Sequence, residues 1–501
     1  MSLSQQYQVR FVTKEKQFAI PSQVYEIKTE SSLKELNSLV NQVLKSSHEE
    51  HQTQEFAFLT NGYLLKERFS DHLETIEEDY RGAEAVIEVE YFVRTQTPEP
   101  FNSFLNNDWV SSVQANGEHV LNGCYDGTVN VWSLQDGQHK LTVPAHKAPV
   151  KAIHWVSTGA LRSAESLQLG ENDLLFISSS YDETSALWKW NTQNDQVEKM
   201  QVYKGHIRSV DCLDVFDQVL VTGSYDKMIK LWLMNQKKSD VEKEAADEEV
   251  PAKKKRTQDN IIKSPYTTLK AHAEAITDLC WMVENESKES NENKAEKGKN
   301  LPDLASCSMD NTIRIWDMEL FQEKQTLKGS KAFLTMNYSP VNRMLITGAC
   351  DNFVRLFDPR ANEGSIVRAG YSSHSGWVTS VCWRSSHAYH FLSGSMDKSV
   401  KQWDLRSTKA PLFDLLGHEE NVMAVDWTNA GYMISGSADN HIKIFRASWF
   451  DYLAIGKCFD STLKLHSSPL YANIVSDVLI ETSIRKAVSS FVVIYCLWIH
   501  L

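Results

Sequence analysis

The chain has 501 residues, a formal net charge of −13 and 42% hydrophobic residues, enough for two or three domains. This acidic balance argues against general affinity for the nucleic-acid backbone, although it is compatible with local basic patches. Eight cysteines without a Cys-x-x-Cys pair predict reduced thiols instead of a disulfide framework or a zinc site. The first residues lack the long apolar core of a secretory signal.

Residues 1–95 are expected to form a small α+β domain of ubiquitin-like order. Apolar residues at helical spacing indicate a helix, with Ser31 or Ser32 as its N-cap. Asn61-Gly62 favours a tight hairpin turn. With 16 acidic and 10 basic residues, the segment is expected to present a negative surface, for solubility or for binding. The expected elements are strands at 7–12 and 23–27, a helix at 31–44, a hairpin of 56–59 with 63–65, and a strand at 86–93.

A three-point pattern recurs seven times in the rest of the chain. In each copy an aspartate is followed six residues later by Trp or Phe, and a small polar residue stands four residues before the aspartate. Such a repeat determines the architecture before any single residue does. The copies are Asn122/Asp126/Trp132, Ser178/Asp182/Trp188, Thr222/Asp226/Trp232, Ser306/Asp310/Trp316, Thr347/Asp351/Phe357, Ser393/Asp397/Trp403 and Ser435/Asp439/Phe445.

Each copy reads as two apolar strands joined by a tight polar turn. Five copies also carry a histidine ahead of a further strand, namely His146, His206, His272, His374 and His418. The pattern resembles the WD-repeat family, whose units are four-stranded propeller blades. The resemblance implies a mainly β fold: a seven-bladed WD-repeat propeller preceded by the small α+β ubiquitin-like domain. It also implies a buried hydrogen-bonded chain of His, Ser or Thr, Asp and Trp inside the blades.

A Ser, a His and an Asp could also be read as a hydrolase triad. A catalytic site is made once, whereas this set recurs around the ring, so the structural role is preferred. The fifth copy has Ser330 in place of the histidine, and the first has Asp108-Trp109 there. These two blades are expected to be less rigidly tied than the others.

The aspartates are 56, 44, 84, 41, 46 and 42 residues apart, which places insertions in the second and fourth blades. The propeller is assigned to residues 96–446, with a charged, disordered insertion at about 235–262. Residues 99–105 could supply a strand that completes the last blade. The tail, 447–501, matches neither domain, and its apolar run at 491–499 is too short for a membrane span.

Inside the charged insertion lies a basic tetrad that is a candidate nuclear-import signal. Its residues are Lys253, Lys254, Lys255 and Arg256. A second polar insertion, 284–299, is expected to be a loop.

The domain order and the linker sequence at 101–112 resemble the WD-repeat ribosome-biogenesis family that forms a complex with Pescadillo and the block-of-proliferation protein. Notchless is a related family with a similar N-terminal domain. The resemblance covers about residues 5–446 and implies assembly of the large ribosomal subunit and processing of its RNA precursor, in nucleolus and nucleoplasm. It implies that the propeller docks on the block-of-proliferation partner. The AAA ATPase midasin is implied to bind the ubiquitin-like domain, with Glu84 completing a magnesium site in midasin. No intrinsic metal or cofactor is implied.

Glu88 and Glu90 alternate on the same strand and are expected simply to line its solvent face. Magnesium prefers carboxylate oxygen and often takes only one or two protein carboxylates, which suits a single glutamate supplied in trans.

A different class of function is that of a substrate receptor for a cullin ubiquitin ligase. Trp403-Asp404-Leu405-Arg406 matches the short W-D-x-R pattern of such propellers, and Arg406 alone carries the extra information. An enzyme has no positive support, because the chain contains no phosphate-binding glycine loop, metal-ligand cluster or nucleophile motif. Direct contact with RNA is left open as a secondary role.

Overall fold

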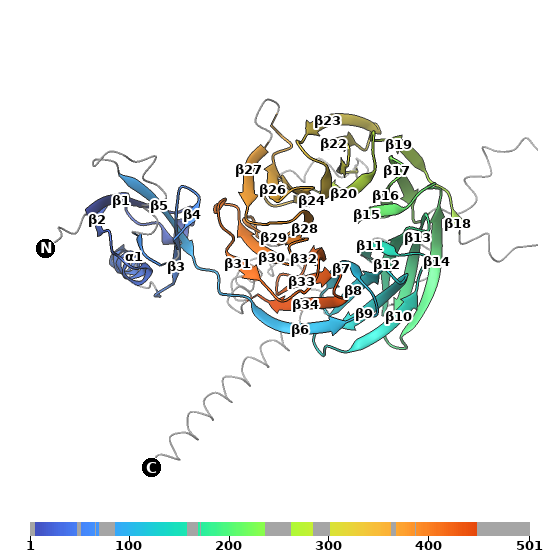
Figure 1. Cartoon of the computed structure of the whole chain (residues 1–501), viewed down its shortest axis with the longest axis horizontal. Helices are drawn as coiled ribbons and strands as arrows, with labels where there is room; N and C mark the ends of the chain where they lie inside the picture. The colour runs from blue at the N-terminus through green and yellow to red at the C-terminus, as the bar shows by residue number, and fades with distance from the viewer. Residues whose placement is uncertain are drawn as a thin grey trace, which may run out of the picture. The chain divides into compact units, whose positions relative to one another are not determined.

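The computed structural model describes ten stretches of the chain, which lie between residues 6 and 447 (Figure 1). They are residues 6–47, 52–65, 67–69, 86–157, 169–170, 172–235, 262–283, 301–361, 367–385 and 387–447. The tail, the tetrad Lys253–Arg256 with its insertion, the second polar insertion and Glu84 lie outside the described residues.

The N-terminal domain is a five-stranded sheet in the order β2-β1-β5-β3-β4 with one α-helix. β1 and β5 run parallel, and the other neighbouring strands are antiparallel, as in a ubiquitin-like fold. Every expected element is present within two or three residues of its predicted bounds. The elements are β1 (Gln6–Val12), the 3-10 turn η1 (Lys16–Phe18), β2 (Val24–Lys28), α1 (Leu33–Ser47), β3 (Phe56–Thr60), β4 (Tyr63–Leu64) and β5 (Ile87–Val93).

Local chemistry explains these bounds. α1 begins with a capping box, in which the Glu35 amide donates to Ser32 Oγ and the Ser32 amide donates to Glu35 Oε2 at 2.9 Å. Ser32, not Ser31, is therefore the N-cap. The β3–β4 turn has positive φ at Asn61 and Gly62, as the dipeptide predicted. Leu36, Val40 and Leu44 of α1 pack with alternate residues of the sheet to form the core.

The repeats form seven sheets within the described part of the chain, and Figure 1 shows them as blades around a centre with their first strands innermost. The first four blades are β7 (Val110–Asn116), β8 (His119–Cys124), β9 (Thr128–Ser133), β10 (His139–Pro144); β11 (Val150–Val156), β12 (Asp173–Ser180), β13 (Thr184–Asn191), β14 (Gln196–Lys204), with a fifth strand β18 (Ile262–Lys263); β15 (Val210–Phe216), β16 (Val219–Ser224), β17 (Met228–Leu233), β19 (Thr267–Lys270); and β20 (Ile276–Met282), β21 (Asp303–Ser308), β22 (Thr312–Asp317), β23 (Gln322–Lys328).

The last three blades follow the same plan. They are β24 (Phe333–Ser339), β25 (Met344–Ala349), β26 (Phe353–Phe357), β27 (Val367–Ser372); β28 (Val378–Trp383), β29 (His390–Ser395), β30 (Val400–Asp404), β31 (Phe413–Leu415); and β32 (Val422–Asp426), β33 (Tyr432–Ser437), β34 (His441–Arg446) with β6 (Glu99–Leu105). The mainly β fold, with a seven-bladed propeller after a small α+β domain, is confirmed.

The ring is closed by β6, which precedes all the blades in sequence and forms the outer strand of the seventh. Its bounds are those that the sequence predicted for a completing strand. Phe104 of β6 stacks on Trp132 of the first blade at 4.8 Å between ring centroids, which joins the last blade to the first. Closure in this way gives the seventh blade its fourth strand and packs the last blade against the first.

Candidate functional site

The recurring polar residues form hydrogen-bonded chains inside the blades. In the third blade His206 Nδ1 lies 2.7 Å from Asp226 Oδ2, and His206 Nε2 lies 2.8 Å from Thr222 Oγ1. The Trp232 indole donates to the same hydroxyl at 2.9 Å. Since the hydroxyl accepts from the indole, it can donate to Nε2, which leaves the imidazole proton on Nδ1 facing the carboxylate.

The same chain recurs in three more blades, and without the indole in a fourth. It runs through His146, Ser178, Asp182 and Trp188; His272, Ser306, Asp310 and Trp316; His374, Ser393, Asp397 and Trp403; and His418, Ser435 and Asp439. The hydroxyl residues of these chains are at most 1% exposed. No substrate can reach them, so the chains are structural and not hydrolase sites.

The first and fifth blades use other residues. In the fifth, two Arg355 guanidinium nitrogens donate to Asp351, at 3.0 and 2.6 Å, and take the role that the histidine has in five other blades. In the first, Trp132 donates to Asn122 Oδ1 at 3.0 Å and Asn122 donates to Asn106 Oδ1 at 3.1 Å, so Asp126 stays exposed. The first and fifth blades therefore each have other hydrogen bonds in place of the histidine chain. The lower rigidity expected of these two blades stays a prediction.

The hydrogen-bonded chains inside the blades should make the stability of the fold depend steeply on pH in the acidic range. Burial opposes ionisation of Asp182, but hydrogen bonds from His146 and Thr184 prevail and lower its pKa to about 2. The pKa values of Asp226, Asp310 and Asp439 are also lowered by such bonds against burial. A lowered carboxyl pKa stabilises the fold above the unfolded value of about 3.9, and this stability is lost as pH falls through the folded value. We expect the melting temperature to fall steeply below about pH 4.

Buried aspartates near the ring centre act in the opposite direction. Burial raises the pKa of Asp278 to about 6, even though the Met336 amide donates to it at 2.8 Å. Stability from a raised carboxyl pKa is full below the unfolded value and is lost as pH rises through the folded value. The melting temperature should therefore rise slightly from pH 7 to 5 before it falls, and Asp278→Asn should flatten that rise. The melting temperature can be measured by tryptophan fluorescence at each pH. A value that stays constant from pH 7 down to pH 3 would contradict both expectations.

One face of the propeller exposes aromatic side chains. In the blades the residue before the repeat aspartate donates its amide to a carbonyl at the start of the innermost strand, as Tyr125 does to Trp109 and Tyr225 does to Ser209. The turns that bear these residues thus share the face where the innermost strands begin. The exposed aromatic side chains there, called the aromatic face below, are Trp109 (49% exposed), Tyr181 (40%), Tyr225 (46%) and Trp377 (48%).

Two of these rings are linked through Tyr125, and a third carries a cation on its face. Trp109 and Tyr125 lie 5.4 Å apart between centroids, and Tyr125 and Tyr181 lie 6.3 Å apart. The Arg208 guanidinium lies over Tyr225 at 5.7 Å. Contiguous exposed aromatic groups are typical of protein-binding surfaces. Sequence reasoning missed them, although the tyrosine before the aspartate in copies one to three was a readable signal.

Arg406 is buried between the propeller and the N-terminal domain, which the W-D-x-R pattern did not predict. Its guanidinium binds Asp404 through two nitrogens, at 2.9 and 2.6 Å, and its side chain is 5% exposed. It lies 3.7 Å from the ring centroid of Phe92 in the N-terminal domain and 4.7 Å from that of Tyr389. An arginine that binds a ligase adaptor must be accessible, so this geometry disfavours the cullin reading.

Glu88 and Glu90 behave differently from each other. Glu88 is 62% exposed and faces Arg10, as a solvent-face residue should. Glu90 is 19% exposed and pairs with Lys14 at 3.3 Å and with Arg406 at 4.0 Å. Its assignment to the solvent face is wrong, because the propeller covers that part of the strand.

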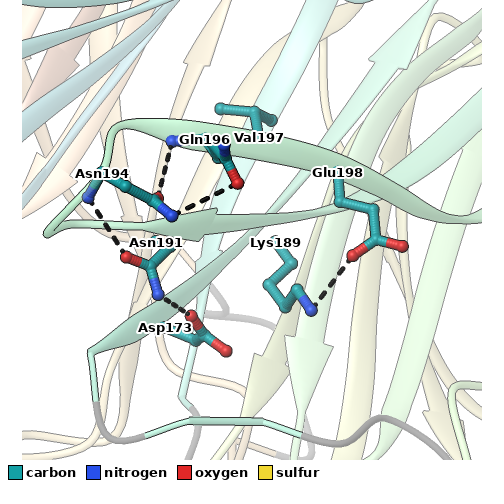
Figure 2. A pocket seen from close by; sticks show the side chains of 7 residues that line it. All are labelled: Asp173, Lys189, Asn191, Asn194, Gln196, Val197 and Glu198. Carbon is teal, nitrogen blue, oxygen red and sulfur yellow. Dashed lines mark hydrogen bonds and ion pairs between the residues drawn. The ribbon is translucent and has the colours of Figure 1, made fainter.

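A polar hollow on the second blade is lined by side chains that mostly bind one another. It lies among β12, β13 and β14, and Figure 2 shows hydrogen bonds and an ion pair among its polar residues. Asn191 donates to Asp173 at 2.8 Å, and Lys189 pairs with Glu198 at 3.1 Å. Within the described residues there is no cluster of three or more His, Cys, Asp or Glu that could hold a metal ion. The helix that the structure describes is too short or too polar to cross a membrane.

Comparison with known proteins defines the class. The N-terminal residues 7–73 match the NLE (NUC135) domain, and WD domain, G-beta repeats match 99–133, 197–232, 263–317, 321–358, 365–404 and 409–446. The second blade, of which the repeat model matches only the strand β14, still carries the full chain from His146 to Trp188. The protein is therefore a WD-repeat propeller with an NLE domain.

Close relatives identify the family. The chain is 40% identical to the ribosome biogenesis protein WDR12 homolog of Ixodes scapularis over 89% of its own length and 99% of that protein. It is 38% identical to the homologs of Aedes aegypti and Culex quinquefasciatus over 90% of its length and 97% of theirs. The chain belongs to the WDR12 family of ribosome biogenesis proteins.

Proposed function

We propose that this protein is a non-enzymatic assembly factor for the large (60S) ribosomal subunit, acting in processing of the ribosomal RNA precursor. The observation that carries the proposal is the match to WDR12 homologs along nearly their whole length. The structure supports a scaffold, because the recurring hydroxyl groups are buried inside the blades and are held there by hydrogen bonds to the recurring histidines. The protein works in the nucleolus and nucleoplasm, with Lys253–Arg256 as its import signal.

The two domains have separate partners in this proposal. The propeller holds Pescadillo and the block-of-proliferation protein together on the pre-60S particle. The N-terminal domain is held by the AAA ATPase midasin, with the Glu84 carboxylate as one ligand of a magnesium ion in midasin. Magnesium accepts one carboxylate in trans because it needs few protein ligands and prefers oxygen.

The aromatic face is the surface that we assign to the block-of-proliferation partner. Aromatic anchors near the centre of an interface usually carry most of its binding energy. We expect the triple variant Trp109→Ala, Tyr181→Ala, Tyr225→Ala to bind this partner at least about tenfold more weakly in a pull-down titration. The control is Leu320→Ala, an exposed apolar residue in the β22–β23 turn at the other end of its blade. Equal binding of a folded triple variant would exclude this face.

A cullin-ligase receptor is the alternative, and the burial of Arg406 speaks against it. Direct RNA contact remains a secondary role, limited to local cations such as Arg208 and Lys147 because the whole chain is acidic.

Depletion tests the proposal. Loss of the protein should lower free and assembled large subunits in a sucrose gradient and should accumulate precursors of the large-subunit RNAs. Re-expression of the wild-type chain should restore both. Normal subunit ratios and normal precursor processing after complete depletion would exclude the proposed role.

A further inference from the structure

The outward face of the N-terminal sheet has a buried aromatic residue that its own domain does not cover. On β5 the alternate residues Ile87, Val89 and Tyr91 belong to the domain core, so Phe92 points to the opposite face. Yet Phe92 is only 2% exposed. A phenylalanine on that face would be in water if the domain stood alone.

Arg406 of the sixth blade covers it. The guanidinium carbon lies 3.7 Å from the Phe92 centroid, while the same group is fixed by two hydrogen bonds to Asp404. Asp404 is fully buried and also lies 3.4 Å from His390, which holds it in place. A guanidinium fixed in this way is preorganised, so stacking it on an aromatic ring costs little side-chain entropy.

Charged side chains and a backbone hydrogen bond add to the contact between the N-terminal domain and the sixth blade. Glu90, next to Phe92 on β5, lies 4.0 Å from Arg406. The burial of Glu15 raises its pKa, which the positive charge of Arg406 opposes. At the tip of the β3–β4 turn, the Lys409 amide donates to the Gly62 carbonyl at 3.4 Å. A methyl group added at Gly62 would come within 2.8 Å of Thr408, so the turn is packed directly on the propeller.

We propose that Arg406 locks the N-terminal domain onto the sixth blade, so that the two domains move as one body and the outward face near Phe92 becomes accessible only when the lock opens. Arg406 is a positioning residue in this device, and Phe92 is its counterpart. Only residues 94–98 separate β5 from the ring-closing strand β6, and five residues span at most about 18 Å. When Arg406 is stacked on Phe92, the sixth blade resists a mechanical force applied to the N-terminal domain. When this contact is broken, the force acts through the linker on β6. This inference does not depend on which protein binds the domain.

The test is the tumbling of the N-terminal domain in the full-length protein, measured by methyl relaxation at Ile27 and Ile87. In the wild type these methyl groups should tumble with the propeller. In Phe92→Ala and in Arg406→Ala their correlation time should fall by about twofold or more, because the domain becomes a separate small body. Arg406→Lys should give an intermediate value, since lysine keeps the charge but loses the planar stacking and the two-nitrogen contact.

Two variants show whether a change in tumbling comes from loss of the Phe92–Arg406 contact or from general damage to the fold. Arg360→Ala removes a matched intrablade pair, with Asp358 at 2.9 and 3.2 Å, and should leave the domain tumbling as in the wild type. Phe92→Ala leaves the Asp404 pair intact, so it opens the lock without an uncompensated buried charge. The double variant Phe92→Ala, Arg406→Ala should release the domain no further than either single variant. Independent tumbling in the wild type, or unchanged tumbling in both folded single variants, would overturn the proposal, whatever the outcome for ribosome assembly.

Discussion

Replacing Glu84 by alanine should abolish magnesium-dependent capture of the protein by midasin. In the proposed complex the carboxylate is a magnesium ligand, and its removal leaves an open position that water must fill. We expect affinity to fall by about two orders of magnitude or more, the scale for losing one charged partner at an interface. Glu84→Asp should fail as well, because the shorter side chain cannot reach the ion. The measurement is a binding titration with purified midasin domain in magnesium and in excess chelator.

The matched control for this result is Glu88→Ala. Glu88 is also an exposed acid of the N-terminal domain, and it faces Arg10 across the sheet. Its removal changes the charge by the same amount and should leave capture intact. If Glu84→Ala is folded and binds as well as the wild type in magnesium, the assignment of Glu84 is wrong.

Replacing Asp226 by alanine should produce a larger loss of stability than replacing a repeat aspartate that is exposed. The carboxylate accepts from His206, from the Ile207 amide and from the Met228 amide, and its side chain is 2% exposed. Its loss leaves the buried His206 imidazole and two backbone amides without their acceptor. We expect the free energy of unfolding to fall by about 3 kcal/mol, measured by urea denaturation with tryptophan fluorescence.

Asp126→Ala provides the comparison within the same repeat. Asp126 occupies the same turn position in the first blade, but it is exposed and accepts only from Thr128 among the contacts seen. Its removal should cost well under 1 kcal/mol. Equal losses for the two variants would show that the hydrogen-bonded chain does not stabilise its blade.

Most of the fold could be predicted because its signals are local and repeated. The Asn61-Gly62 turn, the Ser32 N-cap region and the β6 strand each follow from a few neighbouring residues. The blades follow from a pattern that recurs seven times. Such signals survive in a single sequence, since one copy supports the next.

The contact between Phe92 and Arg406 could not be predicted, because it joins residues that are distant in sequence. Phe92 lies on the outward side of its strand, yet it is buried, with Arg406 of another domain stacked on its ring. Arg406 itself belongs to a pattern that suggested a different partner. The pairing of Arg355 with Asp351 is local, only four residues apart, but the repeat pattern gives no reason to expect an arginine in the role of the histidine. Glu84 rests on resemblance alone, since it lies outside the described residues.

The most direct test of the assembly role is affinity purification of the full-length protein from a nuclease-treated nuclear extract, with every co-purifying protein identified. The tag should be placed in an exposed propeller loop, such as the β22–β23 turn, to leave both ends of the chain free. We expect Pescadillo and the block-of-proliferation protein in near-equal amounts, with midasin in trace. Recovery of a cullin and its adaptor without pre-ribosomal proteins would contradict the assembly role and return Arg406 to the centre of the function.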